Sequence, residues 1–195
     1  MRVIAGKFRG HPLRSLRGMD IRPTSDRLRE TLFNVLTAGN PEALVGTVWL
    51  DLFAGTGAVG IEALSRGAKQ VYFVETSAAA AKVNEQNLQS LGIAQGYRIL
   101  QDDLAGVLWR LKREHVSADV VFLDPPYRMQ QAYEDTLTAL ADSPLVWAMS
   151  LVIAEHEKKF DPGNEFGSLL RVRKLVQGNA ALSFYRIGGP PDLNK

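Results

Sequence analysis

The chain contains no cysteine and only three histidines, His11, His115 and His156, which are widely separated. The absence of cysteine excludes a disulfide framework and a thiolate metal site. Because the histidines are scattered, we interpret each as a surface or capping residue and expect no metal. The chain also lacks internal repeats and low-complexity tracts, and its 195 residues suit one well-packed α/β domain.

Long hydrophobic runs are missing as well. No stretch approaches the roughly 20 apolar residues that a membrane span requires. The N-terminus lacks the apolar core of a signal peptide. We therefore expect a cytoplasmic protein that does not bind a membrane.

Acidic residues are scarce near the N-terminus. Through Arg29 the chain carries eight Lys and Arg residues and two Asp residues, a local charge of +6, which leaves −4 for the rest of a chain with net charge +2. A basic segment on a slightly acidic body is typical of a protein that grips nucleic-acid phosphates at one end. The candidate contacts are Lys7, Arg9, Arg22, Arg27 and Arg29. For Arg27 and Arg29, pairing with Asp26 or Glu30 is the alternative.

The N-terminal segment is predicted to differ from the rest of the chain. Residues 1 to about 22 are expected to form an irregular or hairpin-like arm, and Thr24 is the candidate cap of the next helix. Four residues of that helix share one apolar stripe: Leu28, Leu32, Val35 and Leu36. We therefore expect a basic extension at 1–40 that packs on a main domain at 41–195.

Apolar runs and helix-like stretches alternate along the main domain. Strands are predicted at 48–53, 71–75, 97–101, 120–124 and 150–155. Such alternation indicates a parallel sheet with right-handed crossovers. Two more strands, 169–174 and 181–187, flank Gly178-Asn179, a turn signal for an antiparallel hairpin. The fold class is therefore α/β, with a seven-stranded, mostly parallel sheet that ends in an antiparallel hairpin.

A glycine-containing turn follows the first predicted strand. It runs from Asp51 to Gly60, and its candidate cofactor contacts are Asp51, Phe53, Gly55 and Gly57. Glycines let a ligand approach the backbone closely. Dinucleotide folds use a similar loop to seat a pyrophosphate. Here an acid opens the turn, which favours a ligand with a positive amino group.

Acids also follow the second and third predicted strands. Glu75 can accept hydrogen bonds from both ribose hydroxyls, or it can be an ordinary solvated strand-end carboxylate. Of Asp102 and Asp103, one can accept from an adenine amine and the other can cap the following helix. We favour Asp103 for the adenine. Because the carboxyl ends of parallel strands share one crevice, these acids are expected to face one ligand.

Asp124-Pro125-Pro126-Tyr127 follows the apolar run Val120–Leu123. An amino group on a nucleobase ring is a poor nucleophile, because its lone pair is delocalised into the ring. The Asp124 carboxylate and the Pro125 carbonyl can accept both amine hydrogens, and Tyr127 can stack on the base. Prolines fix the loop and add no competing amide donors. All four residues are therefore catalytic candidates, and an ordinary turn with a buried tyrosine is the alternative.

Taken in this order, the motifs resemble the S-adenosylmethionine-dependent amino-methyltransferases of the Rossmann-like class I superfamily. The segments Gly6–Gly10 and Arg22–Asn34 resemble the opening of the bacterial 16S ribosomal RNA guanine-N2 methyltransferases of the D type, so the resemblance spans nearly the whole chain. One position departs from the family, which often has a second acid where this chain has Ser77. We expect Ser77 to cap the helix that starts at Ala78 instead.

The resemblance implies an activity, a cofactor and a partner. It implies methyl transfer from S-adenosylmethionine, with S-adenosylhomocysteine as product and no metal. The implied acceptor is N2 of guanine 966 in 16S ribosomal RNA, within the small ribosomal subunit or its assembly intermediate. The protein is expected to act as a monomer.

Two other functions remain open at this point. The same Asp-Pro-Pro-Tyr motif serves adenine-N6 methyltransferases on DNA or RNA, and the motif does not separate guanine from adenine. A non-catalytic RNA-binding or assembly factor could retain the fold. Such a factor would show no saturable binding of S-adenosylmethionine.

Overall fold

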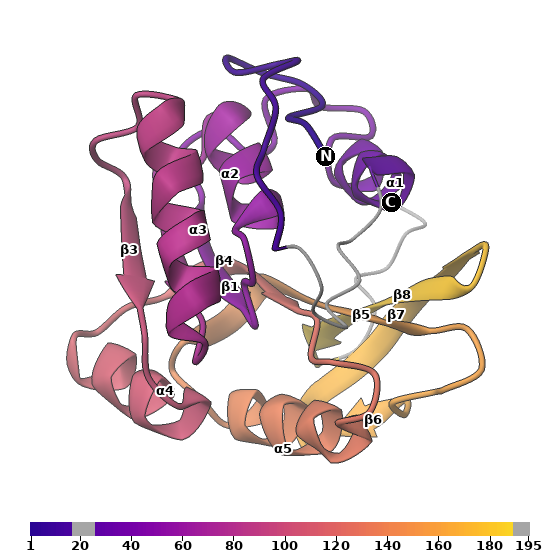
Figure 1. Cartoon of the computed structure of the whole chain (residues 1–195). Helices are drawn as coiled ribbons and strands as arrows, with labels where there is room; N and C mark the ends of the chain where they lie inside the picture. The colour runs from indigo at the N-terminus through magenta and orange to yellow at the C-terminus, as the bar shows by residue number, and fades with distance from the viewer. Residues whose placement is uncertain (17–25, 189–195) are drawn as a thin grey trace. The chain divides into compact units, whose positions relative to one another are not determined.

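The computed structural model describes residues 1–16 and 26–188 (Figure 1). Thr24, the predicted helix cap, lies outside the described residues. The chain divides into two compact units, Met1–Val107 and Leu108–Lys195. The N-terminal arm and the first helix belong to the first unit.

The first unit contains three parallel strands in the order β3-β2-β1. Its elements are α1 (Asp26–Leu36), β1 (Val48–Leu52), α2 (Ala58–Ser65), β2 (Gln70–Val74), α3 (Ala78–Ser90) and β3 (Tyr97–Leu100). Helix α4 (Leu104–Arg113) begins in this unit and ends in the second. The predicted strand-helix alternation is therefore confirmed here, with boundaries shifted by one residue or less at these strands.

The core of the first unit follows from its apolar strands. Trp49, Leu50 and Phe73 are fully buried, and helix α2 packs on β1 and β2. A Cβ on Gly60 of α2 would lie 2.3 Å from the ring of Phe73, so only glycine permits this close approach of helix and strand. This close contact holds α2 against the strands, just after the turn that follows β1 in the sequence.

The N-terminal arm is hairpin-like, as predicted. An isolated antiparallel bridge joins Arg2 and Pro12, and the Val3 amide donates to the His11 carbonyl at 2.9 Å. Val3 and Leu13 are buried. The arm is therefore anchored on the first unit by apolar side chains.

Helix α1 turns one face inward. That face consists of Leu28, Arg29, Leu32 and Phe33. The ring of Phe33 stacks on Trp49 of β1, with 5.6 Å between ring centroids. Of the predicted apolar stripe, Leu28 and Leu32 are buried, whereas Val35 and Leu36 are half-buried. Arg29 and Phe33 complete the buried face in their place.

The second unit combines a parallel pair with antiparallel strands. In the order β4-β5-β8-β7-β6, only β4 and β5 run parallel. Its elements are β4 (Ala118–Leu123), α5 (Gln130–Ala141), β5 (Val146–Glu157), β6 (Glu165–Phe166), β7 (Leu169–Gln177) and β8 (Ala180–Ile187). Gly178 adopts a positive φ of 61° in the two-residue turn between β7 and β8, which confirms the predicted hairpin. The short β6 was not predicted, because two residues carry no periodic pattern.

One histidine departs from the prediction. His11 and His115 are exposed. His156 is fully buried in β5, where its Nε2 lies 2.9 Å from Ser183 Oγ and its Nδ1 lies 2.9 Å from the Glu157 carbonyl. The interpretation of His156 as a surface or capping residue is therefore wrong. Hydrogen bonds to both ring nitrogens are what allow the ring to be buried.

Within residues 1–16 and 26–188, no helix combines the length and the hydropathy needed to cross a bilayer.

Candidate functional site

Asp51 near the end of β1 is a buried carboxylate. It is 2% exposed, and its Oδ2 accepts a hydrogen bond from the Gly60 amide at 2.9 Å. The pKa of Asp51 is raised to about 7: burial is the largest cause, the hydrogen bond from Gly60 opposes it, and the nearby charge of Glu75 adds to the rise. A positive group brought to this carboxylate would lower that pKa again. The site therefore favours a ligand that carries a cation.

The turn after β1 has unusual backbone geometry. Phe53 adopts φ 64°, a left-handed conformation that costs energy for a bulky residue. Gly57 adopts φ 82°, and a Cβ there would lie 2.3 Å from Asn84 Oδ1. At Gly55, with φ 55°, a Cβ would meet no atom within 4 Å. The turn is thus closed behind Gly57 and open beside Gly55, where a ligand has room.

Glu75 ties the end of β2 to this turn. Its Oε2 accepts from the Gly55 amide at 2.8 Å, and its Oε1 accepts from the Ser77 amide at 2.7 Å. Each carboxylate oxygen keeps a second lone pair, so the side chain can still accept from two hydroxyls. The Ser77 hydroxyl accepts from the Ala80 amide at 3.3 Å, which confirms Ser77 as the helix cap.

A pocket opens beside Glu75. Its lining residues are Phe53, Val74, Glu75, Thr76 and Leu104. An aromatic ring, two aliphatic side chains and a carboxylate suit the base and the ribose of an adenosine. Together with Asp51 for an amino group, these residues fit S-adenosylmethionine. Sequence reasoning missed Val74, Thr76 and Leu104, although each directly adjoins a predicted acid.

Of the two acids after β3, Asp103 and not Asp102 caps the following helix. Asp103 Oδ1 accepts from the Gly106 amide at 2.7 Å and so caps α4. Asp102 Oδ1 accepts from the Asp103 amide at 2.9 Å. The assignment of the cap to Asp102 is therefore wrong, because the chain turns into the helix one residue later. The other carboxylate oxygen of Asp103, Oδ2, takes no part in the cap bond. The next residue in the sequence, Leu104, lines the pocket.

The Asp124–Tyr127 loop leaves β4 in the second unit. Pro125 is buried, whereas Asp124 and Tyr127 are partly exposed. The Met129 amide donates to the Pro126 carbonyl at 2.7 Å and closes the turn before α5. Tyr127 is thus not the buried tyrosine of an ordinary strand-ending turn, and part of its surface can meet a ligand.

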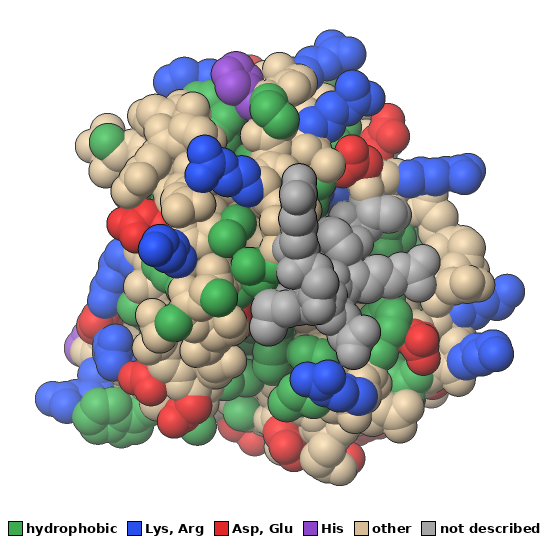
Figure 2. Space-filling view, viewed as in Figure 1, with side chains coloured by type: hydrophobic (Ala, Val, Ile, Leu, Met, Phe, Trp, Pro, Cys, Tyr) green, Lys and Arg blue, Asp and Glu red, His purple; other side chains and the backbone are tan. Residues whose placement is uncertain are grey.

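The predicted nucleic-acid contacts separate into exposed and buried residues. Lys7, Arg9 and Arg27 are exposed, and Lys and Arg side chains stand on the surface at the top of Figure 2, where the arm lies in Figure 1. Arg22 lies outside the described residues. Arg29 is fully buried, and its Nη2 pairs with Asp26 at 3.0 Å and donates to the Arg2 carbonyl. The expectation that Arg29 is free to meet nucleic acid is therefore wrong, and the pairing with Asp26 holds.

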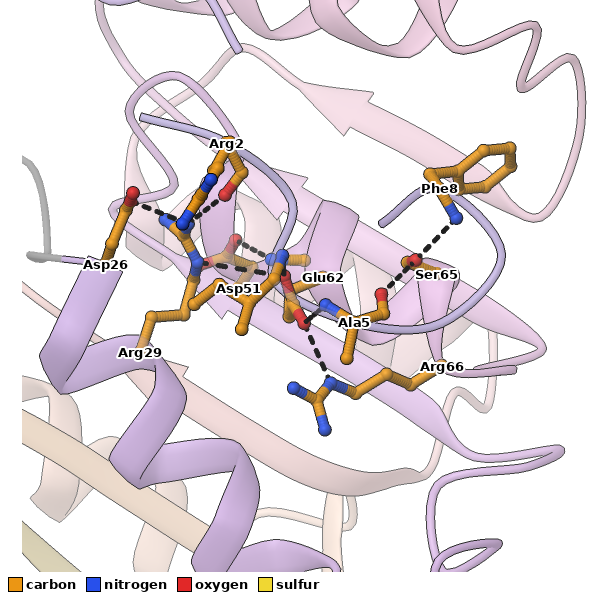
Figure 3. A network of polar contacts seen from close by, with 11 residues as sticks. Arg2, Ala5, Phe8, Asp26, Arg29, Asp51, Glu62, Ser65 and Arg66 are labelled. Carbon is orange, nitrogen blue, oxygen red and sulfur yellow. Dashed lines mark hydrogen bonds and ion pairs between the residues drawn. The ribbon is translucent and has the colours of Figure 1, made fainter. Parts of the chain in front are cut away.

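Glu62 of α2 is the centre of the buried network around Arg29 (Figure 3). Its carboxylate accepts from the amides of Ile4 at 2.7 Å and Ala5 at 3.0 Å, and from Arg66 Nε at 2.8 Å. Arg29 Nε lies 3.9 Å from Glu62 Oε2. Glu62 therefore fastens both the arm and α1 to the first unit. Sequence reasoning missed it, although a single acid within the apolar helix Ala58–Ser65 is a signal for a buried ion pair.

Asn87 of α3 connects the arm to the glycine turn. Its side chain is fully buried and accepts from the Arg14 amide at 2.8 Å. Its amide group donates to the carbonyls of Arg14 at 3.1 Å and Thr56 at 3.0 Å. The arm is thus hydrogen-bonded, through one side chain, to the turn that carries the candidate cofactor contacts.

In the part of the chain that the structure describes, no group of three or more His, Cys, Asp or Glu side chains is placed to hold a metal ion.

Comparison with known proteins identifies relatives along the whole chain. The family model described as "Conserved hypothetical protein 95" matches residues 1–186. Ribosomal RNA small subunit methyltransferase D of Haemophilus influenzae is 38% identical over 160 residues, which cover 81% of this chain and 79% of that protein. The Escherichia coli protein of the same name is 35% identical over 186 residues, 95% of this chain and 89% of that one.

Solved structures show the same fold. The yhhF protein of Escherichia coli has a TM-score of 0.78 at 32% identity and covers 96% of this chain and 97% of its own. TTHA0928 of Thermus thermophilus has a TM-score of 0.80 at 28% identity, with 96% and 99% covered. SMU.776, solved in complex with SAH, has a TM-score of 0.66 at 14% identity, with 86% and 50% covered, and so shows the fold alone. The fold is the α/β fold of class I methyltransferases, as predicted.

Proposed function

This chain belongs to the family described as conserved hypothetical protein 95, and we propose that it transfers a methyl group from S-adenosylmethionine to the exocyclic N2 of a guanine in 16S ribosomal RNA. Guanine 966 is the proposed acceptor. Two relatives that bear the name ribosomal RNA small subunit methyltransferase D support the choice of RNA. The small ribosomal subunit, or its assembly intermediate in the cytoplasm, is the proposed partner of a monomeric enzyme.

The observation that carries the proposal is the Asp124–Tyr127 loop at the end of β4. Asp124 and the Pro125 carbonyl would accept the two hydrogens of the guanine amine and turn its lone pair outward. Tyr127 would stack on a base displaced from its neighbours. Displacing the base costs a few kcal/mol, and less for a base already in a loop. These contacts position a weak nucleophile for in-line attack.

The pocket of the first unit supports the choice of cofactor. Asp51 would pair with the amino group, Glu75 would hold the ribose hydroxyls, and Phe53 and Leu104 would contact the adenine ring. Asp103 Oδ2 remains our candidate for the adenine amine, with Asp102 as the alternative. When bound, S-adenosylmethionine supplies a methyl group on a sulfonium, a very good leaving group.

The remaining chemistry demands little of the protein. Once methylated, the guanine amine is acidic and loses a proton to Asp124 or to water, so a strong general base is unnecessary. The main tasks of the chain are to position the two reactants and to exclude water. Lys7, Arg9 and Arg27 are proposed to hold the RNA through its phosphates.

The test uses small ribosomal subunits from cells that lack this protein. The subunits are incubated with the purified chain and isotopically labelled S-adenosylmethionine, and the modified nucleotide is located by mass mapping. We expect one labelled N2-methylguanine at position 966. The Asp124→Ala variant should lower turnover by about a hundredfold or more while cofactor affinity stays nearly unchanged.

Other results would support the alternatives. Label on adenine N6, in RNA or in duplex DNA offered in parallel, would replace guanine by adenine as the acceptor. Absence of saturable S-adenosylmethionine binding in calorimetry would indicate a non-catalytic assembly factor. Unchanged turnover in Asp124→Ala would remove the role assigned to the loop.

A further inference from the structure

Tyr133 of α5 lies directly behind the Asp124–Tyr127 loop. It is 1% exposed, and its ring packs against Phe160, with 5.1 Å between ring centroids, and edge-on against His156 at 6.4 Å. Its hydroxyl lies 2.8 Å from the Glu155 carbonyl and 3.4 Å from the Pro125 carbonyl. All these residues belong to the second unit. One hydroxyl therefore stands between the carboxyl-terminal part of β5 and the candidate catalytic loop.

The two prolines limit the backbone hydrogen bonds that the loop can donate. Pro125 and Pro126 have no amide hydrogen, so two successive residues cannot donate backbone hydrogen bonds. The bond from the Met129 amide to the Pro126 carbonyl closes the end of the loop that leads into α5. A side-chain donor from the next helix can supply a hydrogen bond to the loop in place of the absent proline amides.

The two distances indicate how the hydroxyl is used. A tyrosine hydroxyl has a single proton, and the 2.8 Å contact makes the Glu155 carbonyl its main acceptor. At 3.4 Å the Pro125 carbonyl receives the weaker share. The Pro125 oxygen is thereby oriented, but most of its acceptor capacity is kept for another donor.

The electrostatics agree with this geometry. Burial is the largest cause of the raised pKa of Tyr133. The neighbouring charge of Asp124 raises this pKa further, and Tyr127 has the same effect to a smaller extent. The hydroxyl therefore keeps its proton under all ordinary conditions and remains a hydrogen-bond donor.

We propose that Tyr133 is a positioning residue for methyl transfer, which orients the Pro125 carbonyl toward the amine hydrogen of the target base. It acts through Pro125 and does not touch the substrate. The inference rests on the proposed function of the loop. It adds to the Asp124–Tyr127 motif a residue six positions beyond it, on the following helix.

The test compares Tyr133→Phe with Tyr185→Phe. Tyr185 is a second fully buried tyrosine of the same unit, and its hydroxyl donates to the Gly163 carbonyl at 2.9 Å, far along the chain from the loop. Each variant keeps the ring and loses one hydroxyl, so a purely structural role predicts similar effects. Methylation of unmethylated small subunits is measured below the melting temperature of the less stable variant.

We expect Tyr133→Phe to lower kcat by about tenfold, with KM for the subunits and the Kd for S-adenosylmethionine unchanged. Tyr185→Phe should stay within about twofold of the unaltered protein. Hydrogen exchange of the Tyr127 and Met129 amides should accelerate in Tyr133→Phe alone. This second measurement needs no activity.

Equal kcat values in the two variants would overturn the positioning role and leave the proposed function intact. Equal rates of hydrogen exchange at the Tyr127 and Met129 amides would do the same. If the unaltered protein methylates nothing, the proposed function fails, and the positioning role falls with it. Fast exchange would then show only that the hydroxyl braces the loop.

Discussion

The first unit contains two buried carboxylates that differ in how they are compensated. Glu62 is fully buried and meets two backbone amides and Arg66 within hydrogen-bond distance, with Arg29 close by (Figure 3). Asp51 is equally buried but accepts from the Gly60 amide, and burial raises its pKa to about 7. One carboxylate is satisfied by the protein. Among the described residues, the other accepts a hydrogen bond from one amide and so keeps acceptor capacity for a cationic group.

This difference separates structural from functional burial. A buried charge stabilises a fold only when donors surround it. Glu62 meets that condition with groups from the arm and its own helix. Asp51 accepts from one amide among the described residues, so its burial lowers the stability of the folded protein. A bound cofactor with a cationic group would raise that stability again.

The largest expected effect comes from removing the charge of Glu62. Glu62→Gln removes the negative charge beside the buried Arg29, which keeps Asp26 as a partner, and beside Arg66. The free energy of unfolding should therefore fall by about 3–5 kcal/mol. Urea denaturation measures this loss, with Glu30→Gln on the exposed face of α1 as control. A loss below about 1 kcal/mol would show that Glu62 does not stabilise the fold as described.

The corresponding change at Asp51 should affect binding. Asp51→Asn keeps an acceptor for the Gly60 amide but removes the charge, so S-adenosylmethionine should bind about a hundredfold more weakly, or about 2.7 kcal/mol. Calorimetry measures the affinity, and Glu42→Gln, at an exposed site, is the control. Unaltered affinity would mean that Asp51 does not hold the amino group.

The pH dependence of stability should also single out Asp51. Because its pKa is raised in the folded protein, its contribution to stability is complete below the unfolded pKa near 3.8 and is lost as the pH rises through about 7. From pH 5 to pH 8 the unliganded protein should lose about 2–3 kcal/mol that Asp51→Asn does not lose. Parallel stability curves for the two proteins would contradict the raised pKa.

The smallest effect is expected on RNA binding, from changes to exposed residues of the N-terminal arm that Glu62 holds. Lys7→Ala with Arg9→Ala should weaken RNA binding several-fold and lower the slope of log affinity against log salt by about 1 for each lost phosphate contact. Lys82→Ala, an exposed residue of α3, is the control. Equal losses in the control would mean that the arm has no particular role in binding RNA.

Much of the fold could be predicted because its signals are local. The alternation of strands and helices, the Ser77 cap and the Gly178-Asn179 turn each depend on residues within a few positions of one another. Of the acids predicted at the strand ends, Glu75 lines the pocket, and the cofactor roles of the others stay predictions. These predictions needed no knowledge of distant parts of the chain.

The remaining features depend on partners that are far away in the sequence. Arg27 and Arg29 look alike in the sequence, yet only Arg29 is buried, because the side of α1 that packs inward brings it to Glu62, 33 positions further along the chain. His156 is buried because Ser183, 27 positions away, satisfies its ring. Asp103 caps α4 in place of Asp102 for a smaller reason, a one-residue shift in where the helix begins.

The sequence by itself determined the fold class and the family, and it predicts the chemistry of the two candidate sites, since these follow from short patterns of residue types. Only the tertiary structure decided which charges are buried and how each is compensated. The reason is physical: the energy of a buried charge depends on the donors that folding assembles around it, and those donors come from segments that the local pattern does not connect.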